Sequence, residues 1–161
     1  MSMHQPPDLA WRIVVQGYRL PGSVGMMFDS DWLKATLHMR AGQGVVKRSL
    51  KFLLVEELER LVSWLRSVRA GIPVRDLRLV EPELRFKYIT RNRVPFVKLI
   101  YEKDERRRLT ADTWAVPTEL DALLGMLAAQ LKHFPCRCAG HHDLTLPEQS
   151  ERTTTSQSLF P

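Results

Sequence analysis

LLVEELERLVSWLRSVRAGIPVRDLRLVEPELRFKY, residues 53–88, holds the change of hydrophobic period that decides the fold class. Its apolar side chains first recur at alternating spacings of 4 and 3 residues, which places them on one stripe of a helix. This stripe consists of Leu54, Leu58, Leu61, Leu65 and Val68. Acidic residues in the first turns, with Arg66 and Arg69 in the last, match the helix dipole. We therefore predict an amphipathic helix from Leu54 that ends at Gly71, which tolerates a left-handed conformation, with Pro73 preventing its continuation.

The residues before this helix show the patterns of strands. Trp11–Tyr18 is rich in β-branched and aromatic residues and is followed by a Pro-Gly turn signal. From Leu33 to Arg40, apolar and polar side chains alternate, as in a strand with one face toward water. Gly-Gln-Gly at 42–44 predicts a hairpin into a second alternating run at 46–52, whose pattern Arg48 interrupts.

Strands resume after the helix. Asp76–Val80 and Leu84–Tyr88 are separated by Glu-Pro-Glu, whose proline cannot donate a ladder hydrogen bond and so predicts a bulge or an edge. Phe96–Tyr101 and Leu109–Val116 follow as two further strands. In the second of these four segments, we expect Leu84, Phe86 and Tyr88 to face one way and Arg85 and Lys87 the other.

A second helix is predicted after the last strand. Thr118-Glu-Leu-Asp121 fits a capping box, in which the Thr hydroxyl and the Asp carboxylate accept hydrogen bonds from amides that the first turn leaves free. Pro135 ends the helix. Its apolar face consists of Leu120, Leu123, Leu124, Leu127, Leu131 and Phe134.

Strands in groups, separated by two helices, indicate an α+β fold. We expect a largely antiparallel β-sheet with two amphipathic helices packed on one face. The length of 161 residues and the apolar fraction of 44% suit one domain with a proper core. We assign residues 9–135 to this domain, residues 136–146 to a Cys/His-containing extension, and the polar residues 147–161 to a disordered tail.

Composition limits the compartment and the partners. The sequence has no run of about eighteen apolar residues, which argues against a transmembrane helix, and its N-terminus lacks the pattern of a secretory signal. Cys136 and Cys138 are too close for an ordinary disulfide, so we expect a reducing compartment, the cytoplasm. The net charge is +6, and the basic excess lies in residues 1–110. Such charge attracts phosphate backbones or an acidic protein surface.

A set of short marks runs in order from Trp11 to Pro135. They are Gly17-Tyr18, Asp31-Trp32-Leu33, Leu53-Leu54, Glu57-Leu58, Leu61, Trp64-Leu65, Glu81-Pro82, Leu84, Phe86, Leu131 and Phe134-Pro135. In this order and spacing, the chain resembles the WapI-like immunity proteins of bacterial toxin–immunity systems. The resemblance implies a small cytoplasmic protein that binds a cognate toxin domain and occludes it. In the best-known case the toxin is a nuclease that attacks tRNA.

The resemblance implies a binding protein and not an enzyme, so we ask which residues would meet the partner. Aromatic and charged side chains on strand faces suit an interface, since aromatic residues and arginine dominate binding hot spots. We predict that Trp32, Glu83, Arg85 and Lys87 bind the partner. For Trp32 the alternative is packing in the core or at a sheet edge, and for Trp64 we expect core packing.

The extension contains a second kind of candidate site. Cys136, Cys138, His141 and His142 lie within seven residues, and thiolates and imidazoles are ligands that zinc prefers. A zinc ion is therefore the metal that this cluster would bind. The alternative is an extension without metal, because Cys-x-Cys is tighter than the usual zinc spacing. Elsewhere the sequence predicts no cofactor.

Two other function classes receive less support. A nucleic-acid-binding domain would use the basic strand faces, but the sequence lacks the interleaved basic and aromatic residues typical of single-stranded RNA binders. The sequence also has no Gly-rich phosphate loop, Gly-x-Ser-x-Gly motif or His-Glu-x-x-His motif that would indicate an enzyme.

Overall fold

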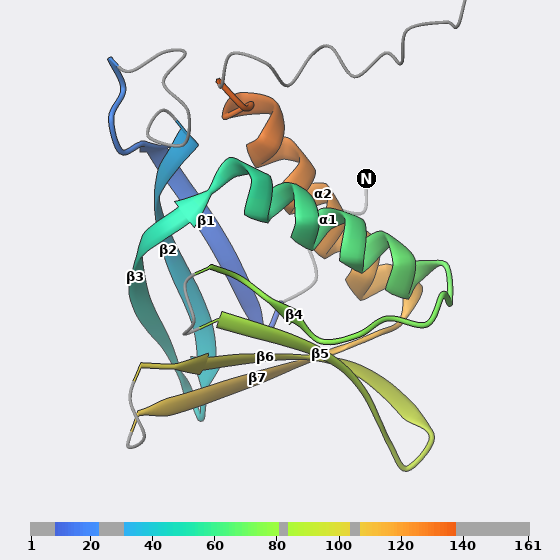
Figure 1. The fold of residues 1–161 in the computed structure, drawn as a ribbon. Coiled ribbons are helices and arrows are strands. Elements are labelled where there is room, and N and C mark those ends of the chain that lie inside the picture. The colour runs from blue at the N-terminus through green and yellow to red at the C-terminus, as the bar shows by residue number, and fades with distance from the viewer. Residues whose placement is uncertain (1–8, 23–30, 81–83, 104–106, 138–161) are drawn as a thin grey trace, which may run out of the picture.

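The structure is a computed structural model that describes residues 9–22, 31–80, 84–103 and 107–137. Within these residues the chain forms seven strands and two helices (Figure 1). In chain order they are β1 (Trp11–Tyr18), β2 (Trp32–Ala41), β3 (Gly44–Leu54), α1 (Val55–Arg69), β4 (Leu77–Arg78), β5 (Leu84–Arg91), β6 (Val94–Glu102), β7 (Arg108–Trp114) and α2 (Pro117–His133). No helix in these ranges is both long and apolar enough to cross a membrane.

The predicted α+β class is confirmed, and every strand pair is antiparallel. The strands divide between two sheets, one of three strands in the order β1-β2-β3 and one of four in the order β4-β5-β6-β7. The division follows the chain path, because β3 leads directly into α1 and the helix carries the chain away before β4 begins. Figure 1 shows both helices lying side by side against the two sheets.

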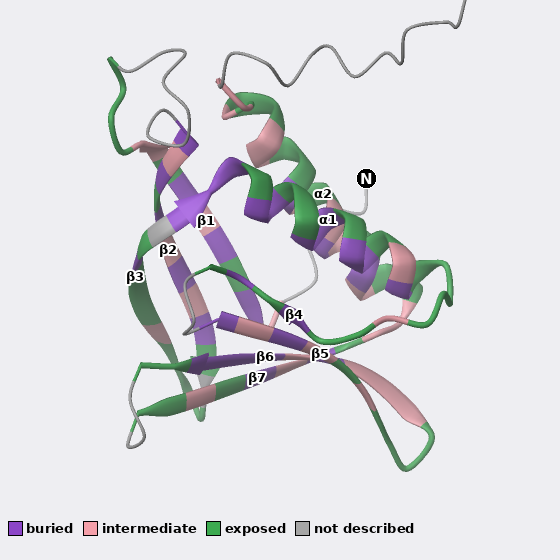
Figure 2. Cartoon of the chain, viewed as in Figure 1, coloured by how far each residue is buried: buried purple, intermediate pink, exposed green. Residues whose placement is uncertain are grey.

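The hydrophobic periods place the core as predicted. The apolar face of β2 is buried, and so is the whole leucine stripe of α1 (Figure 2). The helix ends as expected: Gly71 has φ +71° and its N–H donates to the Val68 carbonyl at 3.1 Å. The N–H of Ile72 donates to the Ser67 carbonyl at 2.9 Å, which completes a Schellman motif.

Three aromatic side chains join the sheets and α1 into one core. Phe86 of β5 is fully buried, and its ring centroid lies 5.3 Å from that of Trp11 in β1. Trp64 of α1 packs on the same ring at 6.4 Å, and its indole N–H donates to the Arg75 carbonyl at 2.7 Å. The predicted core position of Trp64 is therefore confirmed, since tilted aromatic pairs at these distances are typical of interiors.

A buried carboxyl group fixes the start of α1. Glu57 is only 1% exposed, and one of its oxygens accepts a hydrogen bond from the Leu54 N–H at 3.2 Å. The other oxygen accepts from the Val80 N–H, so this side chain ties the helix N-terminus to the segment after β4. Glu57 therefore accepts hydrogen bonds from the backbone at the start of α1 and from the backbone at Val80, which the sequence pattern does not predict.

The predicted capping box of α2 is wrong. The helix begins at Pro117, the N-cap residue is Val116, and no side chain caps it. Proline suits the first helical position because its φ is fixed and it has no N–H to leave unpaired, so the helix starts before Thr118. Asp121 instead forms an ion pair with Arg69 at 2.9 Å, which links the two helices.

Candidate functional site

The three predicted partner-binding residues that the structure describes are divided between the two sheets. Arg85 and Lys87 lie on β5 of the four-stranded sheet and are partly exposed, as expected. Trp32 is partly exposed at the start of β2 in the three-stranded sheet, where its carbonyl accepts the Arg19 N–H at 2.7 Å. Glu83 lies outside the described residues. The predicted site is therefore reduced to Arg85, Lys87 and their neighbours on the four-stranded sheet.

Strand register defines those neighbours. Arg85 lies between Arg78 of β4 and Ile100 of β6, and Lys87 lies beside Lys98. Because side chains alternate along each strand, these residues share the face opposite the buried Phe86. We call this face the outer face; it consists of Arg78, Arg85, Lys87, Ile89, Arg91, Phe96, Lys98, Thr110, Asp112 and Trp114, with the buried Ile100 beneath them.

Part of the positive charge on the outer face is neutralised within the sheet. Lys87 pairs with Asp76 at 3.1 Å, and Asp112 pairs with Arg91 at 3.1 Å and with Lys98 at 3.5 Å. Such partly exposed ion pairs contribute about 0–1 kcal/mol each. They fix the positions of the basic side chains more than they stabilise the fold.

Arg78 and Arg85 are different, because they lie directly opposite each other on β4 and β5. No ion pair joins either guanidinium to another side chain in the described part of the chain. Like charges at such a cross-strand position are destabilising. A pair of this kind suits a surface whose charge is balanced only when an acidic partner covers it.

The outer face also carries an exposed aromatic side chain, in the cross-strand row of Ile89 and Phe96, four residues along the strands from the row of Arg78 and Arg85. Trp114 is 59% exposed, and its ring packs edge-on against Phe96 at 6.2 Å between centroids. Ile89 is the neighbour of Phe96 on β5. Side chains alternate along β7, so Trp114 lies on the same face as Asp112. Trp114 was not among the partner-binding residues predicted from the sequence. Tryptophan and arginine together are the composition of a protein-binding hot spot.

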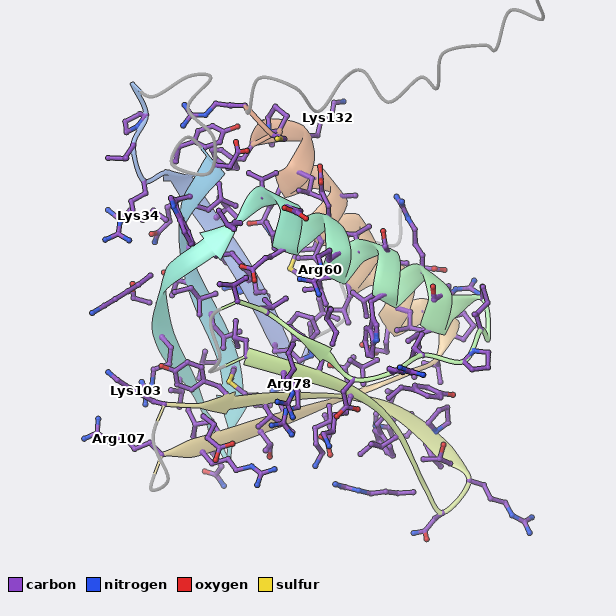
Figure 3. The ribbon with its side chains drawn as sticks, in the orientation of Figure 1. Lys34, Arg60, Arg78, Lys103, Arg107 and Lys132 are labelled. Carbon is purple, nitrogen blue, oxygen red and sulfur yellow. The ribbon has the colours of Figure 1, made fainter. Side chains whose placement is uncertain are left out.

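A second basic surface lies on the three-stranded sheet. β1, β2 and β3 contain no aspartate or glutamate. Their exposed basic side chains include Arg12, Lys47, Lys51 and Lys34, the last of which is labelled in Figure 3. His38 lies between Arg12 and Lys47 in the strand register. Burial lowers the pKa of His38, and the neighbouring Arg12 and Lys47 cations lower this pKa further. This imidazole therefore favours its neutral form more than an isolated histidine does.

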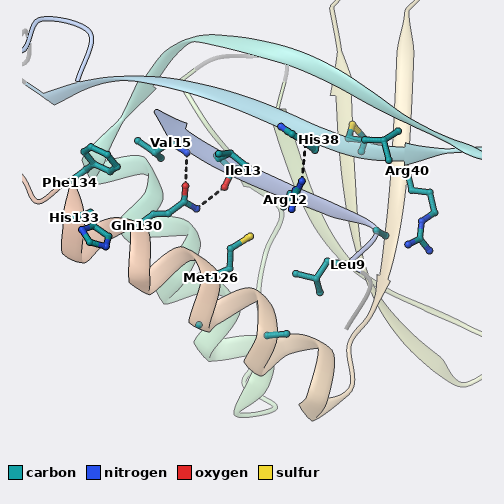
Figure 4. A pocket seen from close by; sticks show the side chains of 16 residues that line it. Leu9, Arg12, Ile13, Val15, His38, Arg40, Met126, Gln130, His133 and Phe134 are labelled. Carbon is teal, nitrogen blue, oxygen red and sulfur yellow. Dashed lines mark hydrogen bonds between the residues drawn. The ribbon is translucent and has the colours of Figure 1, made fainter. Parts of the chain in front are cut away.

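A groove of about 990 Å³ separates β1 from α2 (Figure 4). Gln130 of α2 closes one part of it by bridging the exposed edge of β1. Its carbonyl oxygen accepts the Val15 N–H at 2.5 Å, and its amide nitrogen donates to the Ile13 carbonyl at 2.6 Å. The side-chain amide thus takes the place of a neighbouring strand, one way in which proteins protect an open sheet edge.

The residues after α2 form a polar cluster with the connection between β1 and β2. The buried Asp31 accepts the Cys136 thiol at 3.0 Å and the Arg137 N–H at 2.6 Å. The Arg137 guanidinium lies 3.5 Å from the ring centroid of Tyr18, whose hydroxyl donates to the Pro135 carbonyl at 2.5 Å. Burial raises the pKa of Tyr18, although the Arg137 cation opposes this effect. The cluster attaches residues 135–137 to the three-stranded sheet and to the connection that precedes β2.

The proposed zinc ligands are described only in part. Cys136 belongs to the cluster around Asp31, whereas Cys138, His141 and His142 lie outside the described residues. Among the residues that the structure does describe, no group of three or more His, Cys, Asp or Glu side chains is placed to hold a metal ion. Zinc binding by this segment stays a prediction.

A comparison with known protein families matches the part of the chain that contains every described strand and helix. The sequence model of the Immunity protein WapI-like family matches residues 6–135, which include all seven strands and both helices. The chain belongs to the WapI-like immunity protein family. Searches of curated proteins and of solved structures found no match to it. The family match ends one residue before Cys136, so the predicted metal ligands lie beyond it.

Proposed function

We propose that this immunity-family protein binds a cognate toxin domain and neutralises it by occluding its active surface, without a catalytic step of its own. The observation that carries the proposal is the family match, which extends over the complete described fold and not over an isolated motif. We further propose that the encounter takes place in the cytoplasm and that the toxin is a nuclease, as the family resemblance implies, which this basic protein blocks sterically from an acidic surface next to the nucleic-acid groove.

The outer face of the four-stranded sheet is the surface that we propose for toxin binding. It combines the Arg78 and Arg85 pair with the exposed ring of Trp114. The net charge of +6 favours a toxin domain whose contacted surface is acidic. Complementary charge speeds association, while the aromatic side chains supply most of the area removed from water.

Co-expression tests the function directly. The toxin domain encoded beside the gene of this protein should arrest growth when expressed alone, and growth should recover when both are expressed. Purified together, the two chains should form a stable one-to-one complex, measured by light scattering after size-exclusion chromatography. A toxin domain from an unrelated system is the control. Growth arrest that persists despite soluble expression of this protein would contradict the proposal.

Charge reversal tests the proposed surface. We expect Arg85→Glu combined with Lys87→Glu to weaken toxin binding at least about tenfold, or about 1.4 kcal/mol, because both side chains would then repel an acidic surface. The melting temperature should change little, since among the described residues the only ion pair removed is the partly exposed Lys87–Asp76 pair. Titration calorimetry and thermal melts measure the two quantities.

Arg60→Glu on the solvent side of α1 is the matched control, because it reverses a charge far from β5 in the sequence and on an exposed helix position. It should bind the toxin as the wild type does. Unchanged affinity in the double variant would exclude this part of β5 from the interface, and loss of folding would mean that the two side chains are structural.

A further inference from the structure

The groove between β1 and α2 has the composition of a docking site for an acidic polypeptide. Its floor is apolar, and its lining includes Leu9, Ile13, Met39, Met126 and Phe134. Among the lining residues that the structure describes, no side chain is acidic. Arg12 and Arg40 are both among them, on neighbouring strands. Such a groove favours a ligand that carries apolar side chains flanked by carboxylates.

Gly125 provides an independent observation. It lies in the interior of α2, is exposed, and lines the groove. A glycine inside a helix costs about 1 kcal/mol relative to alanine. Nothing lies within 4 Å of the position that a Cβ atom would take, so packing within the described chain does not require glycine here. A missing side chain at such a place suits the close approach of another backbone.

The dimensions suit a short segment. The wall that α2 contributes extends from Ala122 to Phe134, which corresponds to about 18 Å along the helix axis. An extended chain covers this length with about five or six residues. The opposite wall is the edge strand β1, whose backbone groups at Ile13 and Val15 are already bonded to Gln130, so the segment would be held by side-chain contacts and not by strand addition.

From these observations we infer that the β1–α2 groove binds a short acidic segment of the toxin, with its apolar side chains against Met126 and its carboxylates beside Arg12. This inference rests on the proposed function and names the part of the toxin that this protein would capture. The groove lies between the three-stranded sheet and α2, whereas the outer face belongs to the four-stranded sheet, so separate variants can test the two surfaces.

The main test fills the groove without removing a contact. We expect Gly125→Leu to fold and to bind a catalytically inactive form of the co-encoded toxin domain at least about tenfold more weakly than wild type, because the new side chain occupies the docking space. Gly125→Ala adds one methyl group and should keep affinity within about threefold while raising the melting temperature. Ala128→Leu places the same leucine on an exposed position of α2 that does not line the groove, and should bind normally.

A charge variant keeps the test decisive if Gly125→Leu does not fold. Arg12→Glu is an exposed substitution, and it should weaken binding about fivefold or more and reduce the dependence of association on salt. Arg60→Glu again serves as the control.

Wild-type affinity in both groove variants, with loss of affinity in the Arg85→Glu and Lys87→Glu double variant, would overturn the groove inference and leave the proposed function intact. Absence of toxin binding by the wild-type chain would overturn both. Groove variants that weaken RNA binding but not toxin binding would also overturn the inference, because the groove would then serve a nucleic acid.

Discussion

Phe86→Ala should lower the free energy of unfolding by about 3–5 kcal/mol, the largest effect that we expect from a single substitution in this protein. The side chain is fully buried and contacts Trp11 of the three-stranded sheet and Trp64 of α1. Its removal leaves a cavity where three elements meet, and large flanking rings cannot easily collapse into it. Chemical denaturation, followed by tryptophan fluorescence and far-UV circular dichroism, measures the change.

Phe96→Ala is the matched control, since it removes the same ring from β6 in the same sheet. Phe96 is only partly buried and faces outward beside Trp114, so its removal creates no enclosed cavity. We expect a loss of no more than about 1.5 kcal/mol. Equal effects of the two substitutions would mean that the sheets do not share one core around Phe86.

The elements that could be predicted from the sequence are those whose side-chain period is decided locally. The leucine stripe of α1 and the alternation from Leu33 to Arg40 depend only on which side chains avoid water. The apolar face of each element is buried as expected. Gly71 was also predictable, because few residues accept its left-handed conformation without cost. Asn92 and Arg93, with φ of 50° and 66°, form the two-residue hairpin tip that joins β5 to β6.

The division of strands between two sheets was not predictable in the same way. Alternation says that a strand has a buried face, but it does not say which strand lies beside it. Trp32 and Arg85 both lie on partly exposed strand positions, yet they belong to different sheets. The opposition of Arg78 and Arg85 depends on the β4–β5 register, and the groove at Gly125 depends on how α2 packs beside β1. Such strand pairing and helix packing depend on contacts between segments that are distant in the sequence, which a local pattern does not contain.

The role of Glu57 also could not be predicted from the sequence. In the sequence it is one of several acidic residues in the first turn of a helix, where such residues are common. Its burial arises from the return of the chain after β4, which brings the Val80 N–H to its carboxyl group. Glu57→Ala should lower the free energy of unfolding by roughly 2–4 kcal/mol, since the N–H groups of Leu54 and Val80 both lose their acceptor. Denaturant melts of the full chain measure this loss.

Glu56→Ala separates this role from a general effect of negative charge at the helix N-terminus. Glu56 is exposed in the same turn, so its removal should cost no more than about 1 kcal/mol through the helix dipole. Glu57→Gln should fall between the two variants, because one amide oxygen still accepts a hydrogen bond while the NH₂ group faces a second donor. If Glu57→Ala costs no more than Glu56→Ala, the two backbone N–H groups obtain other partners, and the carboxyl group does not hold the helix start to the segment after β4.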